Sequence, residues 1–308
     1  MNIIFFSDGH GTLTNAVART DEVGQTFFRK LGYIFKKARE TESIIVTAGD
    51  LGDKPREWYF LSEFARFLRK NKDVKLYTIY GQHDAYLYNE STKHATTLGV
   101  LARLRMLTIL NDQPFRPADN IAIYGSSWGA EIPEAVDEPY YANGSVFNVL
   151  MIHKDISNAP LWPGHEYTQA KTFLRRQDTF DGIVCGDIHR SFYYMDSVGR
   201  WITNTGPLMR LEASEYNFEH EPFVYRFDTE ARSLHKIRIP HAPAEEILSR
   251  EHIEIQTTTT QMLEEFVQTI ETDSVEHVNI YENLLTLLEN VDNDVRAEAE
   301  DIVSNVGE

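Results

Sequence analysis

The 308-residue sequence has a single cysteine, Cys185, so an internal disulfide is excluded and the chain cannot build a thiolate zinc site alone. It also lacks any apolar run approaching the ~20 residues that span a bilayer. Its first residues show neither the basic region nor the cleavage site of a secretory leader. We therefore expect a soluble, cytoplasmic protein with no membrane partner, in which any bound metal has nitrogen and oxygen ligands.

Basic residues are scarce near the C-terminus. The net charge is −17, and residues 245–308 carry 17 of the 47 acidic residues but only two of the 30 basic ones. Residues 1–244 are nearly neutral, with 30 acidic and 28 basic residues. Because nucleic-acid backbones attract Lys and Arg, the acidic tail would repel DNA, whereas the first part could still hold a local basic groove.

Apolar strand-like runs at 3–6, 44–47 and 76–79 alternate with helical patterns at about 21–39 and 55–71. Strands that alternate with helices imply right-handed βαβ units and a largely parallel sheet. Further along, closely spaced β-like runs predict a second, more antiparallel sheet packed on the first. These runs lie at 107–110, 121–124, 146–152, 182–185, 192–195, 201–204, 224–227 and 234–239.

Residues 240–243, Pro-His-Ala-Pro, interrupt this pattern and indicate a linker. We therefore predict a domain at 1–240 and a small, acidic helical region at 241–308 that binds a partner or a second copy. Apolar residues at helical spacing predict three short amphipathic helices there. The alternative for this region is a helical cap that folds back on its own domain.

Polar residues of one chemical kind follow five of the apolar runs. Asp8-Gly9-His10, Gly49-Asp50 and Gly81-Gln82-His83-Asp84 follow the first three runs, and His153 and Asp187-Ile188-His189 follow two later ones. Loops beyond the carboxyl ends of strands converge on one crevice in an open α/β sheet. Each motif alone is common in loops and caps, but the ordered series predicts a single site.

Carboxylates mixed with imidazoles suit divalent metals such as manganese, iron or zinc, whereas magnesium and calcium favour oxygen alone. Two such metals ~3.5–4 Å apart can clamp a phosphoryl group and activate a water molecule. The pattern therefore favours hydrolysis of a phosphate ester.

In this order the motifs resemble the calcineurin-like metallophosphoesterase superfamily, with its D-x-H, G-D, G-N-H-D/E, H and G-H-x-H motifs, over about residues 1–240. The resemblance implies a four-layer α/β/β/α sandwich and two divalent metal ions. Mn²⁺ is expected first, with Mg²⁺, Fe²⁺ and Zn²⁺ as alternatives. By the same resemblance, the metal ligands are Asp8, His10 and His189 for the first metal, Asp50 as the bridge, and Gln82, His153 and Asp187 for the second.

The resemblance also assigns a catalytic role to His83, which would stabilise the developing charge or protonate the leaving oxygen, with Asp84 orienting it. Two positions depart from the family pattern. Gln82 replaces Asn, and Asp187 replaces the first His of G-H-x-H. Both changes are in the ligand set of the second metal, and they would shift the preference of that metal site towards harder ions. Alternatively, Asp187 contacts one of the metal-binding residues rather than the metal itself.

The stretch from Asn204 to Arg210 and the strand after it resemble the N-P-G-S-x-x-R segment and "H-K-P" strand of SbcD-type, phage-like exonuclease subunits. This resemblance implies a metal-dependent DNA nuclease of repair or recombination, an exonuclease that could also cut internally, acting with an SMC-like coiled-coil ATPase. Arg210 and Asn204 would then contact substrate, since Arg210 could reach a DNA phosphate. The alternative places Arg210 on a solvated edge.

Two other functions are also consistent with the sequence. The chain could be another member of the superfamily, either a nucleotide phosphodiesterase or a protein phosphatase, because the fold alone does not choose the substrate. It could also be a scaffold with a decayed metal site. Tyr193, Tyr194 and Trp201 could stack bases, or they could pack between the sheets.

Overall fold

The first strand, β1 (Asn2–Phe6), is apolar on both faces, so it is buried on both sides. Ile4 and Phe6 pack against helices, whereas Phe5 on the opposite face packs against a second sheet. Side chains of a strand alternate between the two faces of a sheet, so this pattern places β1 in an inner layer. The computed structural model describes residues 1–251.

Six strands form the first sheet, in the order β14-β13-β1-β2-β3-β4. The strands β1, β2, β3 and β4 run parallel, as the alternation of strands and helices predicts, and β13 pairs antiparallel with β1. The further members of this sheet are β2 (Ser43–Thr47), β3 (Leu76–Thr78), β4 (Thr108–Ile109), β13 (Phe223–Asp228) and β14 (Ser233–Arg238).

The second sheet has the order β11-β12-β10-β7-β6-β5. Its members are β5 (Phe115–Ala118), β6 (Ile121–Ser126), β7 (Phe147–His153), β10 (Gly182–Gly186), β11 (Phe192–Met195) and β12 (Trp201–Asn204).

Two expectations about the second sheet were wrong. Its four central strands are parallel, and only the edge strands β5 and β11 pair antiparallel. In addition, β4, β13 and β14 belong to the first sheet. Closely spaced apolar runs do not report strand direction, because an irregular crossover can return the chain to a parallel strand. The segment between β6 and β7 does so with the short 3₁₀ helix η3 (Tyr140–Ala142).

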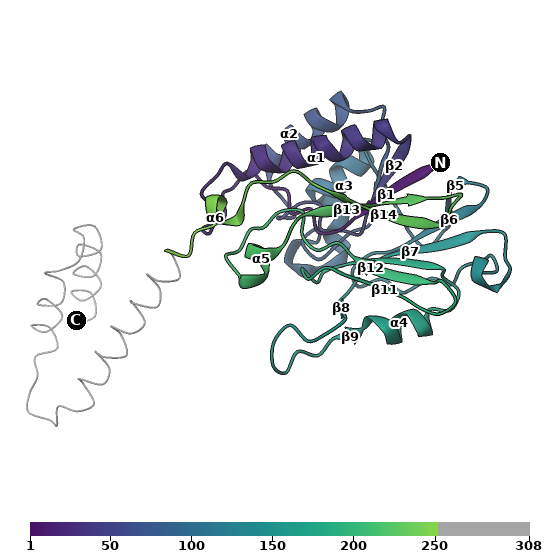
Figure 1. Ribbon diagram of the computed structural model, residues 1–308. Coiled ribbons are helices and arrows are strands. Elements are labelled where there is room, and N and C mark those ends of the chain that lie inside the picture. The colour runs from purple at the N-terminus through teal and green to yellow at the C-terminus, as the bar shows by residue number, and fades with distance from the viewer. Residues whose placement is uncertain (252–308) are drawn as a thin grey trace, which may run out of the picture. The chain divides into compact units, whose positions relative to one another are not determined.

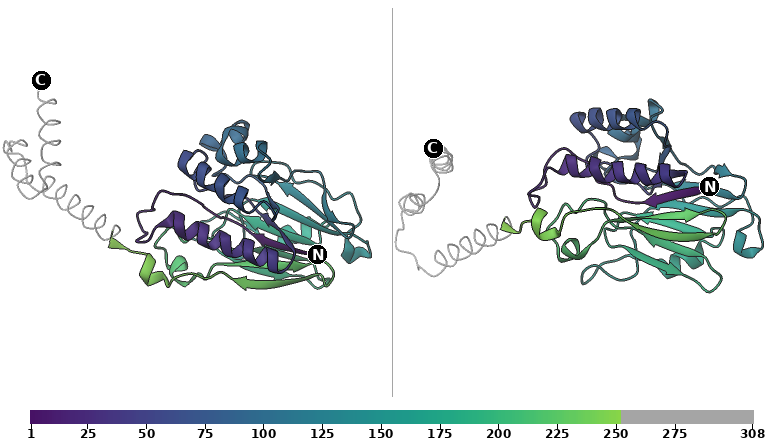
Figure 2. Two further views of the ribbon diagram at one scale, coloured as in Figure 1. Left: turned by 90° about the horizontal axis from the view of Figure 1, so that it is seen from above. Right: turned by 45° about the horizontal axis from the view of Figure 1, so that its top comes forward.

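Helices cover the outer faces of both sheets, which gives the predicted four layers. The helices α1 (Val23–Glu40) and α2 (Trp58–Lys70) pack on the first sheet through residues such as Phe27, Leu31 and Phe64. On the far side, α4 (Ala170–Arg176) packs on the second sheet through Phe173 and Leu174. Figure 1 shows α1 and α2 on one side of the sheets and α4 on the other. In the two further views of Figure 2, α1 (purple) and α2 (blue) lie next to each other.

The remaining elements are short. They are η1 (Tyr86–Tyr88), η2 (Glu90–Ala95), α3 (Thr97–Arg103), β8 (Ile156–Ser157), β9 (Thr168–Gln169), α5 (Glu215–Glu219) and α6 (Ala244–Ile247). Within residues 1–251, no helix combines the length and apolar character that a bilayer crossing needs.

The compact unit that the structure describes runs from Met1 to Arg250. Residues just after the predicted linker still contact it, since the Thr20 N–H donates to the Ile247 carbonyl and the Ser249 N–H donates to the Ala18 carbonyl. The predicted helices of the acidic region lie outside the described residues. A boundary at residue 240 and a partner-binding or dimerising tail therefore stay predictions.

Candidate active site

The five predicted motifs meet at one edge of the two sheets. The strands β1, β2 and β3 are parallel neighbours in the first sheet, and β7 and β10 are parallel neighbours in the second. Their carboxyl ends are therefore close together. Among the described residues, three groups place potential metal-binding atoms within 4.8 Å of one another. They are Asp8, His10 and His189; Asp8, Asp50 and His153; and His10, Asp53 and His83.

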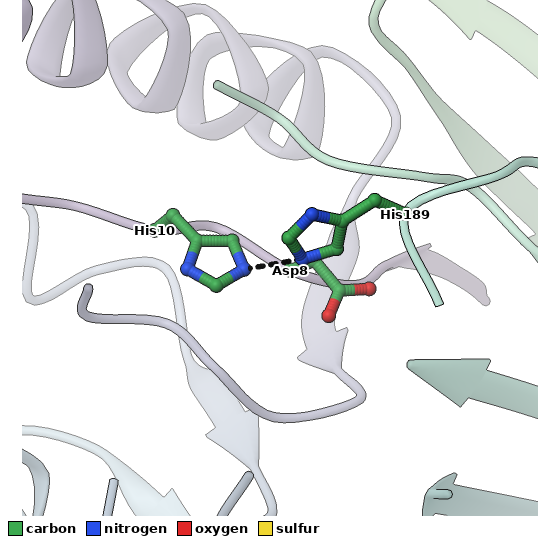
Figure 3. A group of neighbouring side chains, drawn as sticks. All are labelled: Asp8, His10 and His189. Atoms are coloured by element: carbon green, nitrogen blue, oxygen red, sulfur yellow. Dashed lines mark hydrogen bonds between the residues drawn. The ribbon is translucent and has the colours of Figure 1, made fainter. Parts of the chain in front are cut away.

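The first group joins the ends of β1 and β10. The Nε2 atoms of His10 and His189 lie 2.8 Å apart, and the Asp8 carboxylate lies beside them (Figure 3). One Asp8 oxygen accepts a hydrogen bond from the Asp187 N–H, whereas Oδ2 is buried without a partner. His10 Nδ1 lies 3.4 Å from Asp53 Oδ1, a contact that leaves Nε2 free to face the other ligands.

The second group joins the ends of β1, β2 and β7 around Asp50. His153 Nε2 lies 3.2 Å from Asp50 Oδ2 and 3.0 Å from Gln82 Oε1. The other ring nitrogen of His153, Nδ1, donates to the Ala48 carbonyl at 2.7 Å. The remaining oxygen of Asp50, Oδ1, accepts a hydrogen bond from the His83 N–H.

These contacts fit a pair of divalent cations. A buried carboxylate oxygen without a hydrogen bond is costly. Asp8 Oδ2 has none, and Asp50 Oδ2 has only the ion-pair contact with His153. Two imidazole nitrogens at 2.8 Å also require a positive charge or a shared proton between them. His153 presents Nε2 to the site while Nδ1–H is held by a backbone carbonyl, the arrangement that orients metal-binding histidines.

The family model of calcineurin-like phosphoesterases matches residues 1–191, a stretch that contains all seven predicted ligands. This chain belongs to that family. The family binds two divalent metals, and its match agrees with the clusters described above. A comparison with curated protein sequences finds no match.

Solved structures that this calcineurin-like phosphoesterase is similar to include a dimetal phosphatase from Danio rerio. That structure is 12% identical, over 73% of this chain and 91% of the other, with a TM-score of 0.47. The NAD nucleotidase of Haemophilus influenzae is 14% identical over 79% of this chain and 50% of its own, with a TM-score of 0.41. A 5′-nucleotidase precursor from Thermus thermophilus is 11% identical over 87% and 60%, with a TM-score of 0.42.

The backbone of the phosphoesterase is strained at four predicted ligands. Asp8, His10, Asp50 and Asp187 have φ values of 51°, 44°, 46° and 94°, in the left-handed region. Such a conformation costs on the order of 1–3 kcal/mol per residue, and it persists only where the surrounding structure enforces it. Strain that coincides with the predicted ligands indicates a site built to hold them in fixed directions.

Burial and the clustered carboxylates set the charges of the histidines. Burial lowers the pKa of His153, but the charges of Asp50 and Asp8 outweigh it and raise the pKa to about 10. This position therefore favours a positive charge. At His189, burial and the charge of His10 lower the pKa to about 3, so this ring is neutral. Neutral imidazole is the form that binds a metal.

The two residues that depart from the family pattern lie together. Gln82 contacts His153 through Oε1, and its side chain also forms a hydrogen bond with the Asp187 carboxylate. Asp187 is outside the three groups described above. The amide of Gln82 therefore lies between Asp187 and His153. Whether Asp187 binds the second metal or contacts one of its ligands stays a prediction.

His83 is oriented by Asp53, so the expected role of Asp84 needs correction. The Nδ1–H of His83 donates to the Asp53 carbonyl at 2.7 Å, and its ring packs edge-on against His10. The Asp84 carboxylate instead accepts hydrogen bonds from the N–H groups of Asp50 and Gly81. Asp84 thus holds the loop backbone, and Asp53 is a site residue that motif reasoning missed.

Arg210 and Asn204 are buried, which contradicts their prediction as substrate-binding residues. The Arg210 side chain is inside the fold, with 2% of the residue exposed, and its Nη2 donates to the Ala242 carbonyl. Asn204 accepts from the Ser7 hydroxyl and donates to the Ile188 carbonyl. Asn204 therefore ties together the loops after β1 and β10, and neither side chain faces a substrate.

Two adjoining cavities, which share Asp155, Glu166 and Asp187, lie beside the candidate ligands. We call the first the Lys154 cavity, about 600 Å³, which is lined by Lys154, His153 and Asp187, among others. The second, the Trp162 cavity, has about 670 Å³ and is lined by Trp162, Asp187 and His189, among others. Both volumes are in the range of small-molecule sites.

Proposed function

We propose that this calcineurin-like phosphoesterase hydrolyses phosphodiester bonds in DNA, as an exonuclease that can also cut internally, in repair or recombination. The observation that carries the proposal is a pair of adjoining cavities beside the ligand cluster, one lined by His153 and the other by His189. A phosphodiester has a substituent on each side of phosphorus, whereas a monoester has one. A site with two adjoining cavities has room for both substituents of a diester.

Lys154 supports a nucleic-acid substrate, and it lies in a lining that also contains the carboxylates of Asp155, Glu166 and Asp187. Lys154 is exposed at the rim of the Lys154 cavity, and the Ser126 and Ser127 side chains lie along the same wall. Lysine and serine side chains are common contacts of DNA phosphates. This cavity could therefore accept the phosphate backbone next to the scissile bond.

His83 is the residue that would move a proton. Its Nδ1–H is committed to the Asp53 carbonyl, so Nε2 is the nitrogen that can hold a proton for the leaving oxygen. When bound, two divalent metals would polarise the phosphoryl group and lower the pKa of a water molecule. His10, His153 and His189 would hold them together with Asp8 and Asp50.

The proposed partner is an SMC-like coiled-coil ATPase. Its support is the acidic character of residues 245–308, which carry 17 acidic and two basic residues and suit a basic protein surface better than DNA. A second copy of the chain is the alternative partner for this region.

The test is manganese-dependent digestion of end-labelled linear duplex and single-stranded DNA, with and without the candidate ATPase. The proposal predicts nucleotide release that His83→Ala abolishes. His235→Ala is the matched control, because His235 is an exposed histidine on β14, away from the site. Hydrolysis of nucleotide monoesters or phosphoproteins without any cleavage of DNA would contradict the nuclease and favour another activity of the same family.

A further inference from the structure

Trp162 is a large apolar side chain with 57% of its surface exposed, on the loop between β8 and β9. One face of its ring stacks on His165, at 4.2 Å between centroids and 29° between planes. His165 in turn stacks on Tyr167, at 5.4 Å and 27°. The three rings form an aromatic stack that ends at the exposed indole.

Hydrogen bonds fix the middle ring of this stack. The Leu161 N–H donates to His165 Nδ1 at 3.2 Å, so Nε2 carries the proton and donates to Asp155 Oδ2 at 3.0 Å. Both ring nitrogens therefore have protein partners, one in the same loop and one just before β8. Trp162 thus rests on a support that is already ordered, so the entropy cost of stacking a ligand on it is small.

The stack and the candidate metal ligands share one cavity. Trp162 and His165 line the Trp162 cavity together with Asp187 and His189. A ligand that places its phosphate against the metal ligands can therefore reach the indole ring within the same space. The volume of about 670 Å³ accommodates a nucleoside.

The charge of this cavity restricts what it accepts. Among the described residues, its lining contains neither Lys nor Arg but four carboxylates, on Asp155, Glu166, Asp187 and Glu212. Negative potential repels further phosphate groups but tolerates a neutral base and sugar. The Lys154 cavity shares Asp155, Glu166 and Asp187 but lacks Glu212 and adds Lys154, so it is the less negative of the two and the better place for a continuing, charged strand.

We propose that the Trp162 cavity is a subsite for the terminal nucleoside of a nucleic-acid strand, whose base stacks on the indole of Trp162. The rest of the strand leaves through the Lys154 cavity. Aromatic rings hold bases in this way without reading sequence. The path of the nucleic-acid strand through the two cavities rests on the proposed nuclease function. The nucleoside subsite itself can be tested without catalysis.

The first experiment titrates thymidine and deoxyadenosine into the full-length, manganese-loaded protein and follows tryptophan fluorescence. Neither nucleoside contains a phosphoester, so turnover plays no part. We expect saturable quenching that Trp162→Leu abolishes and Trp58→Leu preserves, because Trp58 is an exposed tryptophan, at 80%, that does not line the cavity. Absence of saturable quenching, or quenching that persists in Trp162→Leu, would overturn the subsite.

The second experiment measures cleavage of oligonucleotides whose terminal residue is intact or abasic, at either end. Trp162→Leu should lower kcat/KM by roughly 10- to 100-fold for the intact strand, mainly through KM, and leave the abasic strand unchanged. Trp162→Phe, which keeps an aromatic face, should recover most of the loss. An equal loss on intact and abasic strands would show that the substitution only disturbs the loop, and would overturn the stacking role.

The two proposals fail separately. If nucleosides quench Trp162 but no DNA is cleaved, the nuclease proposal fails and the nucleoside subsite remains. If DNA is cleaved but the terminal base has no influence, the subsite fails and the nuclease proposal remains.

Discussion

The carboxylates of Asp84 and Asp50 each accept a hydrogen bond from a backbone N–H in the loop of the other residue. The Asp84 carboxylate accepts hydrogen bonds from the N–H groups of Asp50 and Gly81, and the Asp50 carboxylate accepts one from the N–H of His83. Burial and the charge of Asp50 raise the pKa of Asp84. The loops after β2 and β3 are thus joined by two carboxylates, of which only Asp50 faces the metal ligands.

Replacing Asp84 tests this loop connection. Asp84→Ala leaves two buried N–H groups without acceptors, so we expect a loss of roughly 2–5 kcal/mol in unfolding free energy and weaker metal binding. Asp84→Asn keeps one acceptor oxygen and should retain most of both. Chemical denaturation and metal titration of the two variants measure the difference. Equal stability of the Asp84→Ala and Asp84→Asn variants would contradict the role of Asp84 in joining the two loops.

The order of strands and helices in the first 80 residues was predictable because apolar periodicity reports them directly. The bounds of β11 and β12 agree with the sequence prediction, at 192–195 and 201–204. Sheet membership was not predictable, because the same alternating pattern suits β13 in either sheet. The five strand-end motifs met as expected, because parallel neighbours end at one edge.

The residues that motif reasoning placed wrongly depend on tertiary packing. Similarity to a segment of another family does not reveal that Arg210 is buried against the Ala242 carbonyl. Trp201 packs between the sheets, as one of the two readings had it, whereas Trp162 is in a loop without periodicity. Asp53 carried one available signal, its place three residues after Asp50 in the same loop.

His83→Ala should keep the metal content of the protein and lower kcat by about 10²- to 10⁴-fold, the usual contribution of a positioned acid or base. The reason is that His83 lies beside the metal ligands without being assigned as one of them. Its Nδ1–H donates to the Asp53 carbonyl, so Nε2 is the nitrogen that can carry a proton to the leaving oxygen. Metal analysis and single-turnover kinetics on the same preparation measure both quantities. Parental turnover in this variant would show that the role is assigned wrongly.

Asp187→His restores the family ligand beside Gln82. A neutral nitrogen in place of a carboxylate oxygen should raise affinity for zinc relative to manganese, since softer ligands favour softer metals. Competition titrations of the parental protein and the variant test this. An unchanged preference would mean that Asp187 contacts only Gln82 and takes no part in metal selection.

Arg210→Ala should destabilise the fold by about 2–4 kcal/mol, because it empties a buried position and removes the donor to Ala242. It should not change the salt dependence of DNA binding. Lys154→Ala is the contrasting variant and should reduce the salt slope by about one phosphate contact. If Arg210→Ala reduces the slope and leaves the melting temperature unchanged, Arg210 is a phosphate contact after all.

His220 should make the fold acid-sensitive. Burial lowers the pKa of His220 to about 4, although the hydrogen bond to the Pro207 carbonyl opposes the shift. The unfolded chain binds this proton at a higher pH, so stability is complete above about pH 6.5 and falls until about pH 4, by roughly 3 kcal/mol. Denaturation of the parental protein and His220→Gln across this range should give a flatter profile in the variant. Parallel profiles would contradict the assignment.

The most direct test of the metal site is anomalous diffraction from a crystal grown with manganese. The account predicts two anomalous peaks ~3.5–4 Å apart, one against Asp8, His10 and His189, the other against His153, with Asp50 between them. Asp50→Ala should lose the pair. A crystal in which these side chains surround no anomalous peak, or in which manganese binds elsewhere, would contradict the account.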